Sequence, residues 1–263
     1  MSPVSGDAVV RAAASVDDVV QLAGQDGLFA WAAGAHKHVG WTARDAYGVL
    51  GTDLSLRDRL MVAGRPDMVA ELADQVLAEQ HLGVRVTGDT ALISAVGQLR
   101  PELMLSDEYG WMQVGTGQLR QPTAQAGTVE WLPADAEDEV AEFLAVAHPG
   151  SEAIPGGIGV LRWAGIREDG DLVAVACEAW SASTLGFMAG VAVAPARRGR
   201  GLGRTLCTFV LGELTSRYGR AALMVDLWNE PAIGLYRGLG MTLRPIRSAR
   251  HHSVPSGAAP VIG

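Results

Sequence analysis

Apolar side chains recur along this chain at the spacings of helices and of strands, and the two spacings alternate through most of its length. Between residues 66 and 80 the apolar positions lie three or four apart, which predicts a helix with one buried face. Shorter helices are expected over 16–22, 27–35 and 90–99, and strands over 59–63, 103–105 and 111–114. We therefore expect the first 120 residues to form an α/β domain.

The second half of the chain continues this alternation. The expected elements, in order, are a strand over 128–132, a helix from Pro133, paired strands over 158–166 and 172–180, a strand over 187–194, a helix from Leu202, a strand over 222–227, and a short helix after Asn229. Residues 115–127 are rich in Gly, Gln and Thr, as is typical of a linker. We therefore predict two domains, 1–120 and 121–263, with the tail from Arg247 a short strand or disordered.

One stretch between a strand and a helix suggests a binding site for an anion. The strand is expected to end at Pro195, which cannot donate a hydrogen bond to a neighbouring strand, and a glycine-rich loop leads from there to the helix at Leu202. The first turn of a helix offers free N–H groups and a partial positive charge, and glycines allow a close approach to the backbone. The loop region concentrates four arginines in a chain of net charge −8, namely Arg197, Arg198, Arg200 and Arg204.

The spacing of the glycines excludes two common nucleotide-binding loops. No Gly-Lys-Ser/Thr follows, so the loop is not a P-loop, and this counts against a nucleotide-dependent kinase or ligase. The pattern Gly199-x-Gly201-x-Gly203 also differs from the G-x-G-x-x-G of dinucleotide-binding folds. The loop does match the pattern Arg198-x-x-Gly201-x-Gly203.

A second pattern follows about twenty residues later. After the strand over 222–227, Asn229 precedes a short helix that carries Leu235 and Tyr236 and ends at Leu239-Gly240-Met241. Together the two patterns resemble the acyl-CoA loop and the second signature of the GNAT superfamily of N-acetyltransferases. Met241 stands where that family usually has Phe.

The resemblance implies a fold, a co-substrate and a reaction. The fold would be a mixed, mostly antiparallel sheet flanked by helices, preceded by a smaller or degenerate α/β domain like the diverged N-terminal half of the glycine N-acyltransferase group. An amine would attack acetyl-CoA directly, with no covalent enzyme intermediate. The cofactor-binding residues implied are Val191, Ala192 and Val193 for the thioester carbonyl, and Arg198, Gly199, Arg200, Gly201, Leu202, Gly203 and Arg204 for the pyrophosphate.

Three residues are candidates for catalytic roles. By its place in the family pattern, Tyr236 would donate a proton to the departing thiolate, and a phenol is a reasonable match for that task. Asn229 would contact the pantetheine arm or a water, or it is simply the cap of its helix. Glu178 lies on an apolar strand face, where it would be either the general base or one partner of an ion pair. Asp226 and His148 are reserve candidates for the base.

Composition excludes several other classes of function. The acidic balance argues against binding to nucleic acid. The absence of a long apolar run and of a leader argues against a membrane protein, so we expect a soluble, cytoplasmic protein. Cys177 and Cys207 are expected to be reduced core residues, and no pattern supports a metal site. The main alternative is a CoA-binding regulatory or interaction module without catalysis, and the oligomeric state and the amine stay open.

Overall fold

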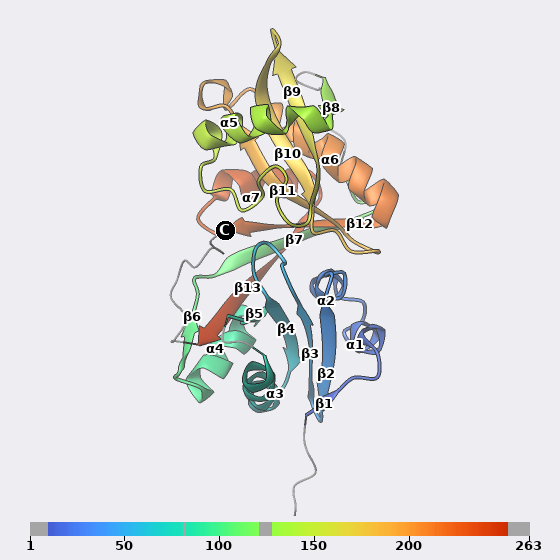
Figure 1. Ribbon diagram of the computed structural model, residues 1–263, viewed down its shortest axis with the longest axis vertical. Helices are drawn as coiled ribbons and strands as arrows, with labels where there is room; N and C mark the ends of the chain where they lie inside the picture. Colours follow the sequence, from blue (N-terminus) through green and yellow to red (C-terminus); the bar gives the residue numbers. More distant parts are fainter. Residues whose placement is uncertain (1–9, 81–82, 121–127, 252–263) are drawn as a thin grey trace, which may run out of the picture. The chain divides into compact units, whose positions relative to one another are not determined.

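The computed structural model describes residues 10–80, 83–120 and 128–251, and its contacts divide the chain into two compact units (Figure 1). The first unit comprises residues 1–108 and 245–263, and the second comprises residues 109–244. Compared with the predicted division at residue 120, the second unit begins earlier and the C-terminal segment belongs to the first unit. The reason is strand pairing, because residues 109–115 pair within the second unit and residues 246–251 pair within the first.

The first unit is a mostly antiparallel sheet packed against helices. Its elements are β1 (Arg11–Ala12), α1 (Val16–Leu22), α2 (Gly27–Ala33), β2 (His38–Ala43), β3 (Ala46–Gly51), β4 (Arg59–Gly64), α3 (Pro66–Glu79), β5 (Arg85–Asp89), α4 (Thr90–Leu99), β6 (Leu103–Leu105) and the end of β13 (Thr242–His251). The strand order is β1-β2-β3-β4-β5-β13, with β6 also paired to β13. Among the described strands of this sheet, β4 and β5 are the pair of parallel neighbours.

The second unit contains β7 (Tyr109–Gly115), β8 (Val129–Trp131), a 3₁₀ turn η1 (Ala134–Ala136), α5 (Glu137–Ala147), β9 (Val160–Glu168), β10 (Asp171–Ala179), β11 (Gly186–Val193), a 3₁₀ turn η2 (Pro195–Arg197), α6 (Leu202–Tyr218), β12 (Arg220–Asp226) and α7 (Glu230–Gly238). From β8 to α7, the second unit follows nearly the same order of strands and helices as the first unit does from β1 to α4. Its strand order is β8-β9-β10-β11-β12-β7, and β11 and β12 are the parallel pair.

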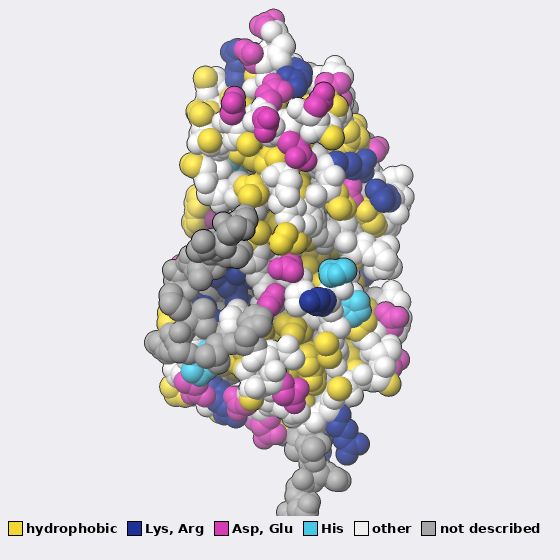
Figure 2. Space-filling model, in the orientation of Figure 1, with side chains coloured by type: hydrophobic (Ala, Val, Ile, Leu, Met, Phe, Trp, Pro, Cys, Tyr) yellow, Lys and Arg dark blue, Asp and Glu magenta, His cyan; other side chains and the backbone are white. Residues whose placement is uncertain are grey.

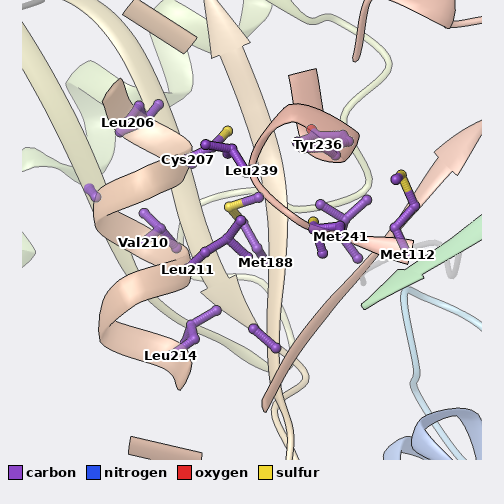
Figure 3. Packing of buried hydrophobic residues seen from close by; sticks show 14 of the residues in the cluster. Met112, Met188, Leu206, Cys207, Val210, Leu211, Leu214, Tyr236, Leu239 and Met241 are labelled. Atoms are coloured by element: carbon purple, nitrogen blue, oxygen red, sulfur yellow. The ribbon is translucent and has the colours of Figure 1, made fainter. Parts of the chain in front are cut away.

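One apolar cluster joins α6 and α7 to the sheet of the second unit (Figure 3). The α6 side chains Leu206, Val210 and Leu214 are fully buried in it, as the helical spacing predicted. Met188 from β11 and Met112 from β7 belong to the same cluster. The cluster therefore holds α6 and the apolar side of α7 against the sheet, beside the loop where the anion site is expected.

The structure confirms the mixed, mostly antiparallel fold and most of the predicted elements. Strands β2, β3 and β5 were not predicted, and β13 continues through Arg247 to His251 as a strand. The expected linker lies partly, at 121–127, outside the described residues, as does the tail from residue 252.

On the face drawn in Figure 2, acidic and basic side chains are scattered among apolar ones. Within the described ranges, no helix is long and apolar enough to cross a membrane.

Candidate functional site

The glycine-rich loop connects β11 to α6 as predicted. Gly199 and Gly201 have positive φ angles of 79° and 84°, in the left-handed region that favours glycine. Gly201 is the N-cap of α6, and no side chain caps the helix there. The first turn of this 17-residue helix therefore presents backbone N–H groups that no side-chain cap occupies.

The parallel strands beside this loop separate along their length. β11 and β12 pair only at Gly186 with Ala221 and at Phe187 with Ala222, in the part of the chain that the structure describes. β11 continues to Val193 and β12 continues to Asp226, where β12 stays paired with β7 on its other edge. The facing edges of the two strands are consequently available for another group to bind between them.

An irregularity in β11 lies at the same level. The register with β10 shifts between Val175 and Cys177, and Gly190 in the facing part of β11 has a φ of 61°. A side chain at Gly190 would collide with the ring of Trp163, and the methyl group of Ala153 would lie 3.4 Å from its Cβ. The loop between α5 and β9 therefore packs over the bulge that precedes Val191.

The four arginines of the loop have different surroundings. Arg197 and Arg200 both pair with Glu168, at 3.1 and 3.3 Å. Arg198 donates to the carbonyl oxygens of Val193 and Ala147, at 3.2 and 3.1 Å, so its guanidinium braces the loop against the ends of β11 and α5. The bond from Arg198 to Ala147 and the pairing with Glu168 were not foreseen from the sequence, because Ala147 lies 51 residues from Arg198 and Glu168 lies 32 residues from Arg200.

Tyr236 lies in α7 with only 7% of its surface exposed (Figure 3). Its hydroxyl makes no hydrogen bond with the described residues. Burial, with a smaller contribution from the nearby Cys207 thiol, raises the pKa of Tyr236 well above its ordinary value. The phenol therefore stays protonated at neutral pH, and its O–H donates to no acceptor among the described residues.

Asn229 caps α7, as one of its two predicted roles requires. Its side-chain oxygen accepts a hydrogen bond from the backbone N–H of Ala232, at 3.2 Å. The amide nitrogen of Asn229 makes no hydrogen bond with the described residues, so the side chain retains a donor. The cap role is confirmed, and the role toward pantetheine stays a prediction.

Glu178 is completely buried in β10, and both of its carboxylate oxygens have partners. Arg162 Nε donates to one oxygen at 2.8 Å, and the Tyr218 hydroxyl donates to the other at 2.6 Å. The Arg162 guanidinium also stacks on the ring of Trp131, 3.6 Å from its centre. This environment is the ion pair that the sequence left open beside the base role. Sequence reasoning missed Arg162 and Tyr218, since nothing local links them to Glu178.

The reserve candidates lie elsewhere on the surface. Asp226 is exposed at the end of β12, and His148 is exposed at the end of α5. Cys177 and Cys207 are free and buried, as predicted. Among the residues that the structure describes, no group of three His, Cys, Asp or Glu side chains is arranged to hold a metal ion.

Comparisons with known proteins agree with this geometry. Residues 126–241, somewhat less than half of the chain, match the model of the acetyltransferase (GNAT) family. The matched residues lie within the second unit. The matched region contains the glycine loop, Asn229 and Tyr236. A comparison with curated proteins gave no match.

Solved structures share the GNAT fold over nearly the whole chain. A GCN5-related N-acetyltransferase from Kribbella flavida is 18% identical, with 93% of this chain and 96% of that chain covered and a TM-score of 0.58. One from Sphaerobacter thermophilus is 16% identical, with 96% and 98% covered and a TM-score of 0.61. A Drosophila protein is 14% identical, with 92% and 98% covered and a TM-score of 0.62. At these identities the likeness concerns the fold alone, and the likeness to glycine N-acyltransferases stays a prediction.

Proposed function

We propose that this protein transfers the acetyl group of acetyl-CoA to an amine by direct attack, in a complex that holds both substrates. The proposal is carried by one observation: the glycine loop at the uncapped start of α6 lies beside two parallel strands that separate after Phe187. The helix start suits a pyrophosphate, because its N–H groups and dipole attract anions. The unpaired strand edges suit an extended pantetheine arm, whose amides can replace the missing ladder bonds.

The residues predicted from the sequence fit definite parts of this reaction. The backbone N–H groups of Val191, Ala192 and Val193, which follow the bulge, would hold the thioester carbonyl and stabilise the oxyanion. As the C–N bond forms and the C–S bond breaks, the Tyr236 hydroxyl would give its proton to the thiolate. The attacking nitrogen loses a proton to water or to a base. Glu178 keeps both proposed roles, and its two partners favour that of an ion-pair residue.

Calorimetric titration of acetyl-CoA tests the binding half of the proposal. Gly199 and Gly219 both have a φ of 79° and both face open space, but Gly199 lies in the loop and Gly219 ends α6. We expect Gly199→Asp to weaken binding at least about 100-fold, because a carboxylate would repel the pyrophosphate at short range. Gly219→Asp should bind as the wild type does. Equal affinities for all three proteins, or no binding by the wild type, would refute the proposed site.

Release of CoA thiol with a panel of amines tests the chemical half. Tyr236→Phe should lower kcat about 10- to 100-fold and leave the affinity for acetyl-CoA within about twofold, since it removes only the proton donor. An unchanged kcat would exclude Tyr236 as the acid. Binding of acetyl-CoA without thiol release for any amine would instead favour a CoA-binding module without catalysis.

A further inference from the structure

One arginine of the loop differs from the other three in having no polar partner. Arg197 and Arg200 share Glu168, and Arg198 donates to two carbonyl oxygens. The guanidinium of Arg204 makes no hydrogen bond or ion pair with the described residues. It lies in the first turn of α6, where a positive side chain is unfavourable because the helix dipole is already positive there. An unpaired arginine at this position is explained if an anion binds beside it.

The side chain of Arg204 extends toward α7 and ends against Gly238. A Cβ atom placed on Gly238 would lie 3.0 Å from Nη2 and 3.1 Å from Nη1 of Arg204. One turn earlier in α7, Leu235 lies 3.4 Å from a Cβ placed on Gly203, the residue before Arg204. The first turn of α6 therefore runs along the face of α7 formed by Leu235 and Gly238.

The backbone of α7 does not itself require glycine at residue 238. The left-handed residue that follows the end of this helix is Gly240, with a φ of 96°. Gly238 is the last residue of α7, has no positive φ, and carries only the cost of glycine's flexibility. Glycine at residue 238 instead leaves room for the guanidinium of Arg204, because it has no side chain.

We propose that Gly238 is a positioning residue that lets the Arg204 guanidinium lie across α7, where it binds a phosphate of acyl-CoA at the start of α6. This inference rests on the proposed function. Arg204 would be the guanidinium that contacts the ligand, while Arg198 braces the loop.

Two alanine substitutions in α7 distinguish a specific effect on Arg204 from a general effect on the helix. In Gly238→Ala the new Cβ meets the mobile end of a side chain, so the guanidinium moves and the backbone stays in place. Gly234 belongs to the same helix, and a Cβ placed there has no atom within 4 Å. Gly234→Ala is therefore the matched control, since both substitutions change helix propensity in the same direction.

Binding of CoA itself, measured by calorimetry with the full-length chain, needs no acceptor amine. Gly238→Ala and Arg204→Gln should each weaken CoA binding about tenfold, because a charge-assisted hydrogen bond to phosphate is lost. Gly234→Ala should stay within about twofold of the wild type. The double variant Gly238→Ala/Arg204→Gln should bind no more weakly than Arg204→Gln alone, since both changes remove the same contact.

Three other results would each contradict a different part of the proposal. Wild-type affinity in Gly238→Ala, or losses that add in the double variant, would show that Gly238 does not act through Arg204. Wild-type affinity in Arg204→Gln would remove Arg204 from the phosphate site and leave the proposed function intact. A wild-type chain that does not bind CoA would refute the proposed function, and this inference with it.

Discussion

The two units of this chain follow nearly the same order of strands and helices, but they connect the fourth strand to the next helix differently. In the first unit β4 ends at Gly64 and α3 begins at Pro66. The start of α3 has no side-chain cap either, but Pro66 has no N–H to offer, and the first-turn acid Asp67 forms a bidentate pair with Arg65 at 2.7 and 2.8 Å, which places a negative charge where an anion would bind. In the second unit the connection is long, glycine-rich and uncapped.

The helix that follows the next strand also differs between the two units, as a comparison of α7 with α4 shows. Asn229 caps α7 with its side chain and Tyr236 follows seven residues later, whereas Asp89 forms no side-chain cap on α4 and the seventh residue after it is the buried Val96. The two units therefore share a similar fold, but the described part of the first unit lacks the residues that form the candidate site in the second. We infer one acyl-CoA site for each chain, in the second unit.

The largest expected effect comes from removing residues 245–263. Residues 246–249 pair with β5, and Ile246 and Ala249 are fully buried in the first unit, so their loss opens a sheet edge and a core. We expect the first unit to unfold, while the second unit keeps its structure and binds acetyl-CoA. Limited proteolysis and calorimetric titration check both halves of this prediction. A chain that ends at residue 251 keeps β13 and serves as the control; equal protease resistance of both truncations would contradict the prediction.

Glu178→Gln tests the buried ion pair of the second unit. We expect a loss of about 2–3 kcal/mol in the free energy of unfolding by urea, because Arg162 and Tyr218 lose a charged acceptor, with the effect reduced by the partial exposure of Arg162. The acidic limb of the pH–rate profile should not move. Nearly unchanged stability with a shifted acidic limb would instead assign Glu178 to the base role.

Alkaline pH should destabilise the second unit through its buried acids. Burial raises the pKa of Cys207 to about 12 and that of Tyr236 well above its usual value, so the native state keeps protons that the unfolded chain releases. The contribution of Cys207 is complete below about pH 9 and is lost as the pH rises toward 12, by about 1.4 kcal/mol per pH unit, whereas that of Tyr236 begins to be lost only above about pH 10. Urea unfolding from pH 8 upward measures this loss. The slope should be smaller in Cys207→Ala, and an equal slope would contradict the assignment.

The smallest effect is expected at the cap of α7. Asn229→Ala should cost about 1 kcal/mol of unfolding free energy, and Asn229→Ser should cost less because its hydroxyl can still accept from the Ala232 N–H. If the amide nitrogen also binds the pantetheine arm, both variants should weaken acetyl-CoA binding by a similar factor. If acetyl-CoA affinity instead decreases only as far as the loss of unfolding free energy explains, more in Asn229→Ala than in Asn229→Ser, Asn229 acts only as the helix cap.

Local signals in the sequence were sufficient for the loop and its helices. Glycines with positive φ, a proline after a strand and apolar residues at helical spacing depend on near neighbours, so they predicted β11, α6 and α7. The same reasoning missed β2, β3 and β5. Glycines such as Gly48 and Gly51 weaken the sequence pattern of a strand, but a Cβ there would come within 3.2 Å of Leu72 and within 2.6 Å of Ala32, so these glycines allow close packing in β3.

Contacts between distant residues were beyond local reasoning. The hydroxyl groups of Thr87 and Ser248 lie 2.8 Å apart in the first unit although 161 residues separate them. Glu168 takes up two of the loop arginines, and Tyr218 reaches Glu178 from 40 residues away. These pairings decide which charges are available to a ligand, and the fold alone brings them together.

The position of β13 also sets the order in which the chain can fold during its synthesis. The second unit is complete once residue 244 has left the ribosome, whereas the first unit, although made earlier, lacks the strand that covers β5 until residues 246–249 emerge. The half of the chain that is synthesised first should therefore be the last to reach its native state, with one sheet edge open while translation continues.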